Sequence, residues 1–244
     1  MESARDARSV HRESAAPIEV NVLRLPEGAS DWDLVAEYLR LRREVFIGDL
    51  SWNLTVHRDI EYEQYDTLRT VYAVAHRGRE VVGGARLNPT TLRVGAGEYV
   101  YSYMIRDACL GLLPGLPTDL CDHEPPVADD IWELTRMATL KDPRISAAII
   151  DAASRFLVAE GASRCLFLGP PAFLRMAKRA GWTAQAMGPV SGNHDGRFVA
   201  ISALLPEGDD ENVAWPDEEP RSRRRQRANG LASGVGDHGQ ALRG

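Results

Sequence analysis

The sequence has few cysteines, no long apolar run and no excess of basic residues. Its three cysteines are odd in number and show no CxxC spacing, which argues against a disulfide framework and against a zinc site. No apolar stretch approaches the roughly 20 residues of a membrane-spanning helix, and the N-terminal residues lack the apolar segment of a signal peptide. We therefore expect a soluble, cytoplasmic protein with no bound metal and no membrane partner.

The charge balance excludes a further class of protein. The formal net charge is −6, whereas phosphate backbones are bound by basic faces, so we expect no nucleic-acid partner. A length of 244 residues with 44% hydrophobic content is enough for one good core. Residues 1–17 and 206–244 are polar and lack apolar periodicity, which predicts two disordered tails around one domain of residues 18–205.

Hydrophobic periodicity divides that domain into strands and helices. The predicted strands are residues 18–24, 71–76, 81–87, 131–139, 165–168 and 198–205. The predicted helices are residues 32–46, 105–113, 143–160 and 171–180, the first capped by Ser30 or Asp31 and the third by Asp142. This order predicts an α/β protein whose mixed central sheet is antiparallel at the front and continues into β-α-β units.

Carboxylates are unusually dense in the first third of the chain. Glu61, Glu63 and Asp66 lie within six residues, the first two on one face of an extended segment and the third beyond a bend. Such a cluster repels itself unless a cation lies among the oxygens. Arg42, Arg86 and a ligand are the cations that we expect to supply this charge.

The segment 131–139 alternates cleanly between apolar and polar residues. In a regular strand Glu133 and Arg136 point to opposite faces, so they share a site only across a bulge or at the strand end. Gly83 and Gly84 stand inside another predicted strand, which indicates a bulge or a close approach of backbones.

Four motifs follow one another in a particular order. They are Arg42 with Val45-Phe46 and Trp52, then IEYEQYD, then VVGGARLNPTT, then WELTR. Together they resemble the acyl-homoserine-lactone synthase (autoinducer synthase) family, which makes quorum-sensing signals, and the element order resembles the GNAT-type acyltransferase fold. The resemblance covers residues 18–205.

The resemblance implies a reaction and a set of site residues. The enzyme would acylate the amine of S-adenosylmethionine, a substrate rather than a cofactor, from acyl carrier protein or acyl-CoA, and would then close the lactone and release methylthioadenosine. The implied catalytic residues are Glu133, Arg136, Arg86 and Asp66, and the implied substrate-binding residues are Arg42, Phe46, Trp52 and Glu63.

The chemistry suggests roles for these residues. The α-amine, with a pKa near 8, must lose a proton, and Glu133 is our first choice of base, directly or through water. A sulfonium beside an adenine is bound well by carboxylates and aromatic faces. The substrate carboxylate is bound well by a guanidinium, and Arg42 and Arg136 are both plausible for this role. Phe46 is equally compatible with a place in the hydrophobic core. Arg86 and Arg136 are also compatible with a structural role, in which they neutralise Glu61 or Asp66.

Several alternatives stay open at the level of sequence. Glu63 stands where the family usually has Asp, and residues 95–130 form a longer segment, which we interpret as a lid or insertion. Residues 141–145 lack the glycine-rich pyrophosphate loop of coenzyme A enzymes, which favours a carrier protein as donor. The alternative functions are a GNAT-type N-acyltransferase of another amine and a non-catalytic nucleotide-binding protein of the same fold.

Overall fold

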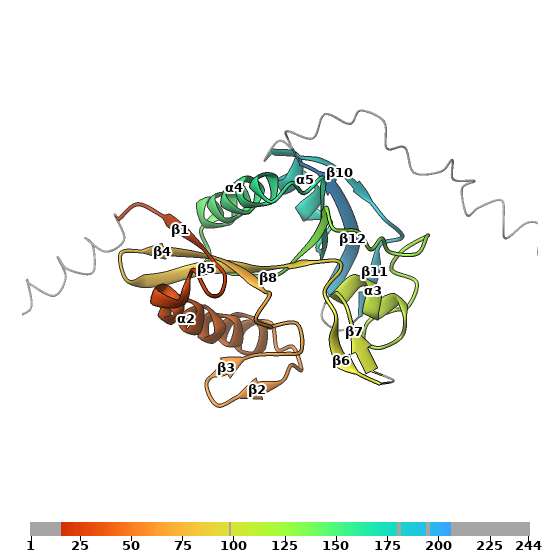
Figure 1. The fold of residues 1–244 in the computed structure, drawn as a ribbon, viewed down its shortest axis with the longest axis horizontal. Coiled ribbons are helices and arrows are strands. Elements are labelled where there is room, and N and C mark those ends of the chain that lie inside the picture. Colours follow the sequence, from red (N-terminus) through yellow and green to blue (C-terminus); the bar gives the residue numbers. More distant parts are fainter. Residues whose placement is uncertain (1–15, 98, 180–181, 194–195, 206–244) are drawn as a thin grey trace, which may run out of the picture. The chain divides into compact units, whose positions relative to one another are not determined.

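A computed structural model describes residues 16–97, 99–179, 182–193 and 196–205. An eight-stranded mixed sheet forms their framework, in the order β1-β4-β5-β8-β9-β12-β10, with β11 pairing β12 (Figure 1). The strands are β1 (Glu19–Leu23), β4 (Val71–Arg77), β5 (Glu80–Pro89), β8 (Ile131–Thr139), β9 (Arg164–Gly169), β10 (Thr183–Ala186), β11 (Ser191–Asn193) and β12 (Gly196–Leu204).

One parallel pair divides this sheet. Neighbouring strands run antiparallel except β8 and β9, whose short register joins Ile131–Glu133 to Arg164–Leu166. The helix α4 (Pro143–Ala159) connects these two strands, so the predicted β-α-β unit and the antiparallel front half are both confirmed.

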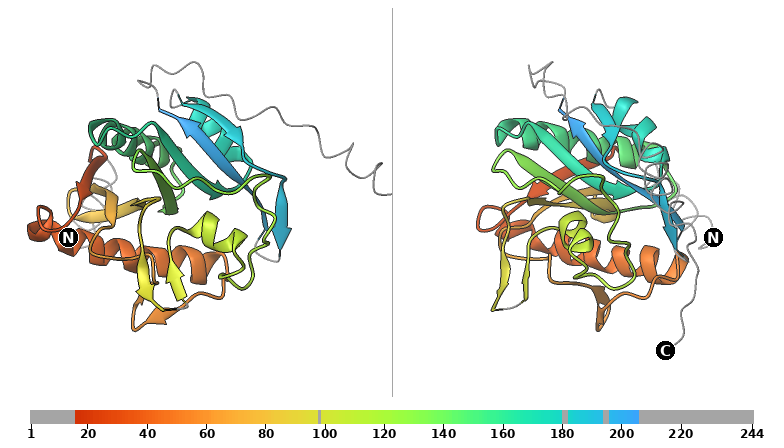
Figure 2. Two further views of the ribbon diagram at one scale, coloured as in Figure 1. Left: turned by 45° about the vertical axis from the view of Figure 1, so that its right-hand side comes forward. Right: turned by 90° about the vertical axis from the view of Figure 1, so that its right-hand side faces the viewer.

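Helices cover the two faces of the sheet. Figures 1 and 2 show α4 and α5 (Ala172–Arg179) on one side, and α2 (Trp32–Arg42) and α3 (Met104–Cys109) on the other. The bulge that Gly83 and Gly84 indicated is present, because the register of β5 shifts against β4 next to Gly83 and against β8 next to Gly84. The groups that come closest to the two glycines are side chains of the helices. A Cβ at Gly83 would lie 2.7 Å from Ile145 of α4, and one at Gly84 would lie 2.6 Å from the ring of Tyr38 of α2. Each glycine therefore lets one helix pack directly on β5.

The N-termini of α4 and α2 differ in how they are capped. Asp142 caps α4 by accepting from the backbone N–H of Arg144 at 3.0 Å, with Pro143 in the first turn. Asp31, one of the two predicted caps, stands at the N-cap position of α2, but its side chain makes no capping bond. The chain already turns through a 3₁₀ segment, Ala29–Asp31, so this side chain is not presented to the free N–H groups of the helix.

Residues 95–130 are less helical than predicted. The helix α3 ends at Cys109, before the predicted end at residue 113.

Two small hairpins lie outside the main sheet. One pairs β2 (Val56–His57) with β3 (Ile60–Glu61), and the other pairs β6 (Val94–Ala96) with β7 (Tyr99–Tyr101). These strands, like β10 and β11, were not predicted, because two to four residues are too few to show a period.

The predicted tails lie almost wholly outside the described residues, which belong to the first of two units, Met1–Gly208. The prediction that both tails are disordered stays a prediction. Among the described helices the longest, α4, has 17 residues, and none reaches the length and hydropathy of a membrane span.

Candidate active site

Arg42, at the C-terminal end of α2, holds two carboxylates in a fully buried position. Its Nη1 and Nη2 donate to Oδ1 and Oδ2 of Asp66 at 2.7 and 3.0 Å, and its Nε donates to Oε2 of Glu61 at 2.5 Å. The paired contacts to Asp66 are the bidentate geometry that a guanidinium fork favours. Because these donors are engaged inside the protein, the geometry supports pairing within the cluster, and the substrate-binding role of Arg42 stays a prediction.

Arg86 lies on β5, fully buried, and joins the same cluster from the sheet. It forms ion pairs with Glu63 at 2.7 Å and with Asp66 at 3.1 Å, and its Nε donates to Oγ1 of Thr135 on β8 at 3.1 Å. Burial alone would raise the pKa of the Asp66 carboxyl, but Arg86 and Arg42 together hold that pKa well below its usual range. Asp66 is therefore ionised at neutral pH and lies between two cations.

A β-bulge determines where Arg136 points. Two residues of β8, Arg136 and Met137, stand opposite the single residue Ala85 of β5, and Arg136 has a φ of 52°. The hydroxyl of Tyr38 donates to the carbonyl of Arg136 and so holds this unusual backbone from α2. The extra residue turns Arg136 to the face that already carries Glu133. Of the two possibilities that the sequence left open, a bulge and the strand end, the bulge is present.

Arg136 completes the cluster at its more open side. Its Nη2 donates to Oε2 of Glu63 at 2.7 Å, its Nε lies 3.4 Å from Oε1 of Glu61, and its Cζ lies 5.7 Å from the ring centroid of Phe46. Against the effect of burial, Arg136 and Arg86 lower the pKa of Glu63. The predicted pairing of Arg86 with Asp66 and of Arg136 with Glu61 is therefore present. The Glu63 side chain is 15% exposed, against 1% for Glu61 and 0% for Asp66.

Two aromatic rings are stacked beside this open side. Phe46 and Trp52 have ring centroids 5.0 Å apart and planes inclined by 5°. Phe46 belongs to a π-helical segment, Arg43–Asp49, that continues α2, and such segments are frequent at functional sites. In the part of the chain that the structure describes, the buried Nε1 of Trp52 has no hydrogen-bond partner, so it is a donor available to a ligand.

Glu133 is fully buried and is held by the first turn of α3. Its Oε2 accepts from the backbone N–H of Met104 at 2.9 Å and its Oε1 from that of Ile105 at 2.8 Å. Burial raises the pKa of Glu133 to about 7, while the two backbone donors and Arg86 favour the charged form. A carboxyl that titrates near neutral pH can accept a proton and release it again.

The structure brings seven of the eight predicted site residues into one connected group. Arg42, Glu63, Asp66, Arg86 and Arg136 are joined by ion pairs, and Phe46 and Trp52 by the cation–π contact and the stack. Among the described residues, Glu133 makes no hydrogen bond or ion pair with the other seven, and it shares only their face of the sheet. The catalytic and binding roles of all eight stay predictions.

A second polar group behind the cluster was not predicted. Asp107 of α3, fully buried, accepts from the hydroxyl of Tyr65 at 2.7 Å and from the backbone N–H and hydroxyl of Ser102 at 2.9 and 2.8 Å. It thereby ties the helix that holds Glu133 to Tyr65 in the acidic loop, residues 61–66, which carries Glu61, Glu63 and Asp66. No spacing in the sequence indicates it, because α3 falls in the poorly patterned segment 95–130.

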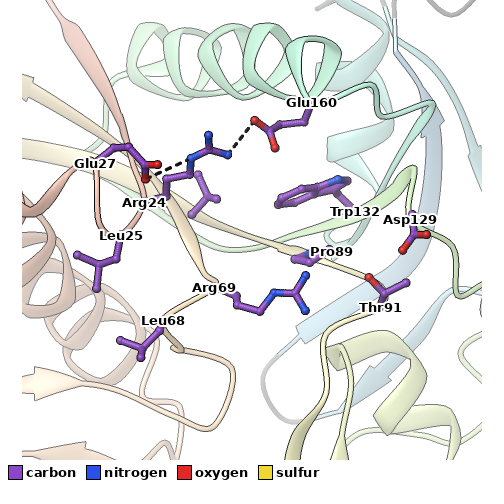
Figure 3. A pocket seen from close by; sticks show the side chains of 11 residues that line it. Arg24, Leu25, Glu27, Leu68, Arg69, Pro89, Thr91, Asp129, Trp132 and Glu160 are labelled. Carbon is purple, nitrogen blue, oxygen red and sulfur yellow. Dashed lines mark hydrogen bonds and ion pairs between the residues drawn. The ribbon is translucent and has the colours of Figure 1, made fainter.

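A cavity of about 390 Å³ opens near the end of β1, but none of the eight predicted residues lines it (Figure 3). Its wall includes Trp132, Arg69 and the ion pair of Arg24 with Glu160 at 2.8 Å. Trp132 belongs to the core on the α4 face, so the cavity lies away from the arginine and carboxylate cluster.

The mixed sheet, its single parallel pair crossed by α4, and the buried site beside the pair define an enzyme of the acyltransferase fold. The autoinducer synthase family model matches residues 29–111. The acyl-homoserine-lactone synthase of Pseudomonas aeruginosa is 30% identical over 174 residues, which cover 69% of this chain and 78% of that protein. The chain belongs to the acyl-homoserine-lactone synthase family.

Solved structures share the fold of this chain. TofI, in a ternary complex with an inhibitor and MTA, is 26% identical with a TM-score of 0.60, over 77% of this chain and 91% of TofI. BjaI, a CoA-dependent acyl-homoserine lactone synthase solved with SAM and isopentyl-CoA, is 21% identical with a TM-score of 0.65, over 87% and 99%. The predicted family, fold and enzyme class are thus confirmed.

Proposed function

We propose that this enzyme makes an N-acyl-L-homoserine lactone from S-adenosylmethionine and an acyl thioester, and releases methylthioadenosine. The main support is the position of the Phe46 and Trp52 stack beside Glu63 and Arg136. Flat aromatic faces suit an adenine and a sulfonium, and the partly exposed Glu63 adds negative charge for the sulfonium. S-adenosylmethionine enters as a substrate, and the proposal includes no cofactor.

In the first step the α-amine attacks the thioester carbon. An N–C bond forms, the C–S bond breaks, and the thiolate leaves with a proton. The amine must lose its own proton, and Glu133 receives it directly or through a water, for which a pKa of about 7 is well matched. A second N–H proton is released as the amide forms and leaves with the thiolate, while the proton on Glu133 passes to solvent, so Glu133 ends the step as it began.

In the second step the substrate carboxylate attacks the carbon that bears sulfur. A C–O bond forms, the C–S⁺ bond breaks, and its electron pair neutralises the sulfonium as methylthioadenosine leaves. The step needs no proton transfer, so the protein contributes mainly by position. We assign the carboxylate to Arg136, whose side chain is 9% exposed while that of Arg42 is fully buried.

The acyl donor we propose is an acyl carrier protein. A diphosphate binds well at a free helix N-terminus, whereas the N-terminus of α4 is capped by the carboxylate of Asp142. Arg77 and Arg144 already pair with this carboxylate at 2.7 and 2.8 Å. Initial rates with the same acyl chain on carrier protein and on coenzyme A test the proposal, and faster turnover with coenzyme A would contradict it.

Mass spectrometry of extracts from cells that express the chain tests the reaction itself, together with release of methylthioadenosine by the purified enzyme. We expect an acyl-homoserine lactone and an equal amount of methylthioadenosine. An acylated amine without methylthioadenosine would favour a GNAT-type N-acyltransferase. Binding of S-adenosylmethionine without any product would favour a non-catalytic protein. We place the reaction in the cytoplasm, where free thiols such as Cys109, Cys121 and Cys165 persist.

A further inference from the structure

One buried acceptor next to the site has no partner. Asn88 on β5 is 1% exposed, and its Nδ2 donates to the carbonyl of Tyr65 at 2.9 Å. Its Oδ1 is also buried, and the described residues offer it no hydrogen bond. The orientation of the amide is fixed by chemistry, because the Tyr65 carbonyl can only accept and must therefore face the NH₂ group. Buried polar atoms normally have partners, so this one calls for a donor from outside the chain.

The position of Asn88 points to the identity of that donor. Asn88 stands directly opposite Glu133 in the pairing of β5 with β8. Side chains of such opposite residues lie on one face with Cβ atoms about 5 Å apart. The next pair on that face, Arg86 and Thr135, is joined by a hydrogen bond of 3.1 Å. The free acceptor therefore belongs to the strand position opposite the candidate base and next, on the same face, to Arg86 of the charged cluster.

We propose that Oδ1 of Asn88 binds the attacking amine of the substrate, as a second acceptor beside Glu133. The inference rests on the proposed function, and it adds a binding residue to that site. A carboxylate or phosphate is excluded as the group bound here, since Oδ1 cannot donate. The substrate ammonium carries three N–H donors and meets this requirement.

The two acceptors divide the work on this amine. Glu133 or its water takes one proton, whereas the neutral amide oxygen of Asn88 keeps its N–H bond because it is far too weak a base to take it. The amine then has two N–H groups and one lone pair. Holding the N–H groups directs the lone pair, which forms the new bond to the thioester carbon as the thiolate leaves.

A purely structural role for Asn88 predicts a different outcome, and the chain supplies the control. Oγ1 of Thr70 donates to the same Tyr65 carbonyl at 2.9 Å, also from a fully buried position. Thr70→Val therefore removes this support of the loop, together with the bond that Oγ1 accepts from the Thr67 N–H at 2.8 Å, without touching Oδ1. If Asn88 only holds this carbonyl, Asn88→Leu and Thr70→Val should show the same defects.

The test is isothermal titration of S-adenosylmethionine and methylthioadenosine into wild type, Asn88→Leu and Thr70→Val. Methylthioadenosine lacks the amine, so it reports whether the rest of the site is folded. We expect Asn88→Leu to weaken S-adenosylmethionine by about tenfold or more, as for a lost hydrogen bond to a charged group, and to leave methylthioadenosine within about twofold. We expect Thr70→Val to change the two affinities by the same factor.

A second variant keeps the test decisive if Asn88→Leu does not fold. Asn88→Asp retains an acceptor at the same place, and we expect it to preserve the preference for S-adenosylmethionine over methylthioadenosine. Equal weakening of both ligands by Asn88→Leu, no weakening of either, or loss of the preference in Asn88→Asp would overturn the inference. A wild type that binds S-adenosylmethionine but releases no methylthioadenosine contradicts the proposed function instead, while the affinities still decide the role of Asn88.

Discussion

Arg42 and Asp66, 24 residues apart, meet through the two terminal guanidinium nitrogens, Nη1 and Nη2, at 2.7 and 3.0 Å, and neither side chain is exposed. The contact fastens the acidic loop to the end of α2. Two further residues join this contact. Glu61 accepts from Nε of Arg42, and the hydroxyl of Tyr72 donates to Oδ1 of Asp66 at 3.0 Å. Because every member depends on the others for its charge balance, the group should respond strongly to the loss of one.

Arg42→Met should reduce the free energy of unfolding by about 3–5 kcal/mol, since it leaves buried carboxylates without their cation. Urea unfolding followed by circular dichroism measures the loss. Arg40→Met is the matched control, because Arg40 pairs with Asp59 on the exposed side of the same helix. It should leave the unfolding midpoint nearly unchanged. A similar midpoint in both variants would show that the buried cluster contributes little to stability.

Acid should destabilise the protein through the same cluster. The folded-state pKa values of Asp66 and Glu63 are depressed, so the unfolded chain binds protons first as the pH falls. The stability from these groups is complete above the unfolded values, near 4, and is lost progressively below them. The melting temperature between pH 7 and pH 3 should fall less steeply in Asp66→Asn than in wild type. Parallel curves would assign the acid sensitivity to other carboxylates.

Glu133→Gln should lower kcat by roughly 10²–10⁴-fold, because it removes the proton acceptor and keeps the shape. Affinity for S-adenosylmethionine should change little. In wild type, kcat/KM should rise with pH as Glu133 deprotonates near its pKa of about 7. Steady-state rates from pH 5.5 to 9 test this, and the variant should retain only a limb that belongs to the substrate amine. Wild-type kcat in Glu133→Gln would move the base to Glu63, the one carboxylate of the cluster with a partly exposed side chain.

Arg136→Lys should weaken S-adenosylmethionine binding by about 1–3 kcal/mol, since a lysine keeps the charge but not the fork that matches a carboxylate. Isothermal titration gives the affinity, and kcat should fall less than in Glu133→Gln. Arg144→Lys is a suitable control, because its side chain is 76% exposed at the start of α4. Unchanged affinity in Arg136→Lys would return the carboxylate to Arg42.

Trp52→Phe should preserve the stack on Phe46 and remove the unpartnered indole N–H. We expect methylthioadenosine to quench tryptophan emission in wild type, and the quenching to be largely lost in the variant. The ligand should also bind somewhat more weakly. Quenching of equal size in both proteins would place the ligand away from this ring.

Much of this architecture could be predicted from residue patterns. Apolar alternation located the main strands, and the Asp142-Pro143 pair located the start of α4, because these signals are local. The acidic cluster also predicted arginine partners, since three carboxylates close together cannot all stay charged without cations. The neighbours of Glu133 could not be predicted, because the N–H groups of Met104 and Ile105 come from a helix in a segment without a clear period.

The amino-acid sequence by itself determined the family, the element order and the residue types that the chemistry needs. Only the tertiary structure decided how they combine: Arg136 reaches Glu63 because a bulge adds one residue opposite Ala85. Asn88 faces Glu133 because of the register of β5 against β8. Register and bulges depend on pairings between residues far apart in the chain, and a shift of one residue would turn every side chain of a strand to the other face.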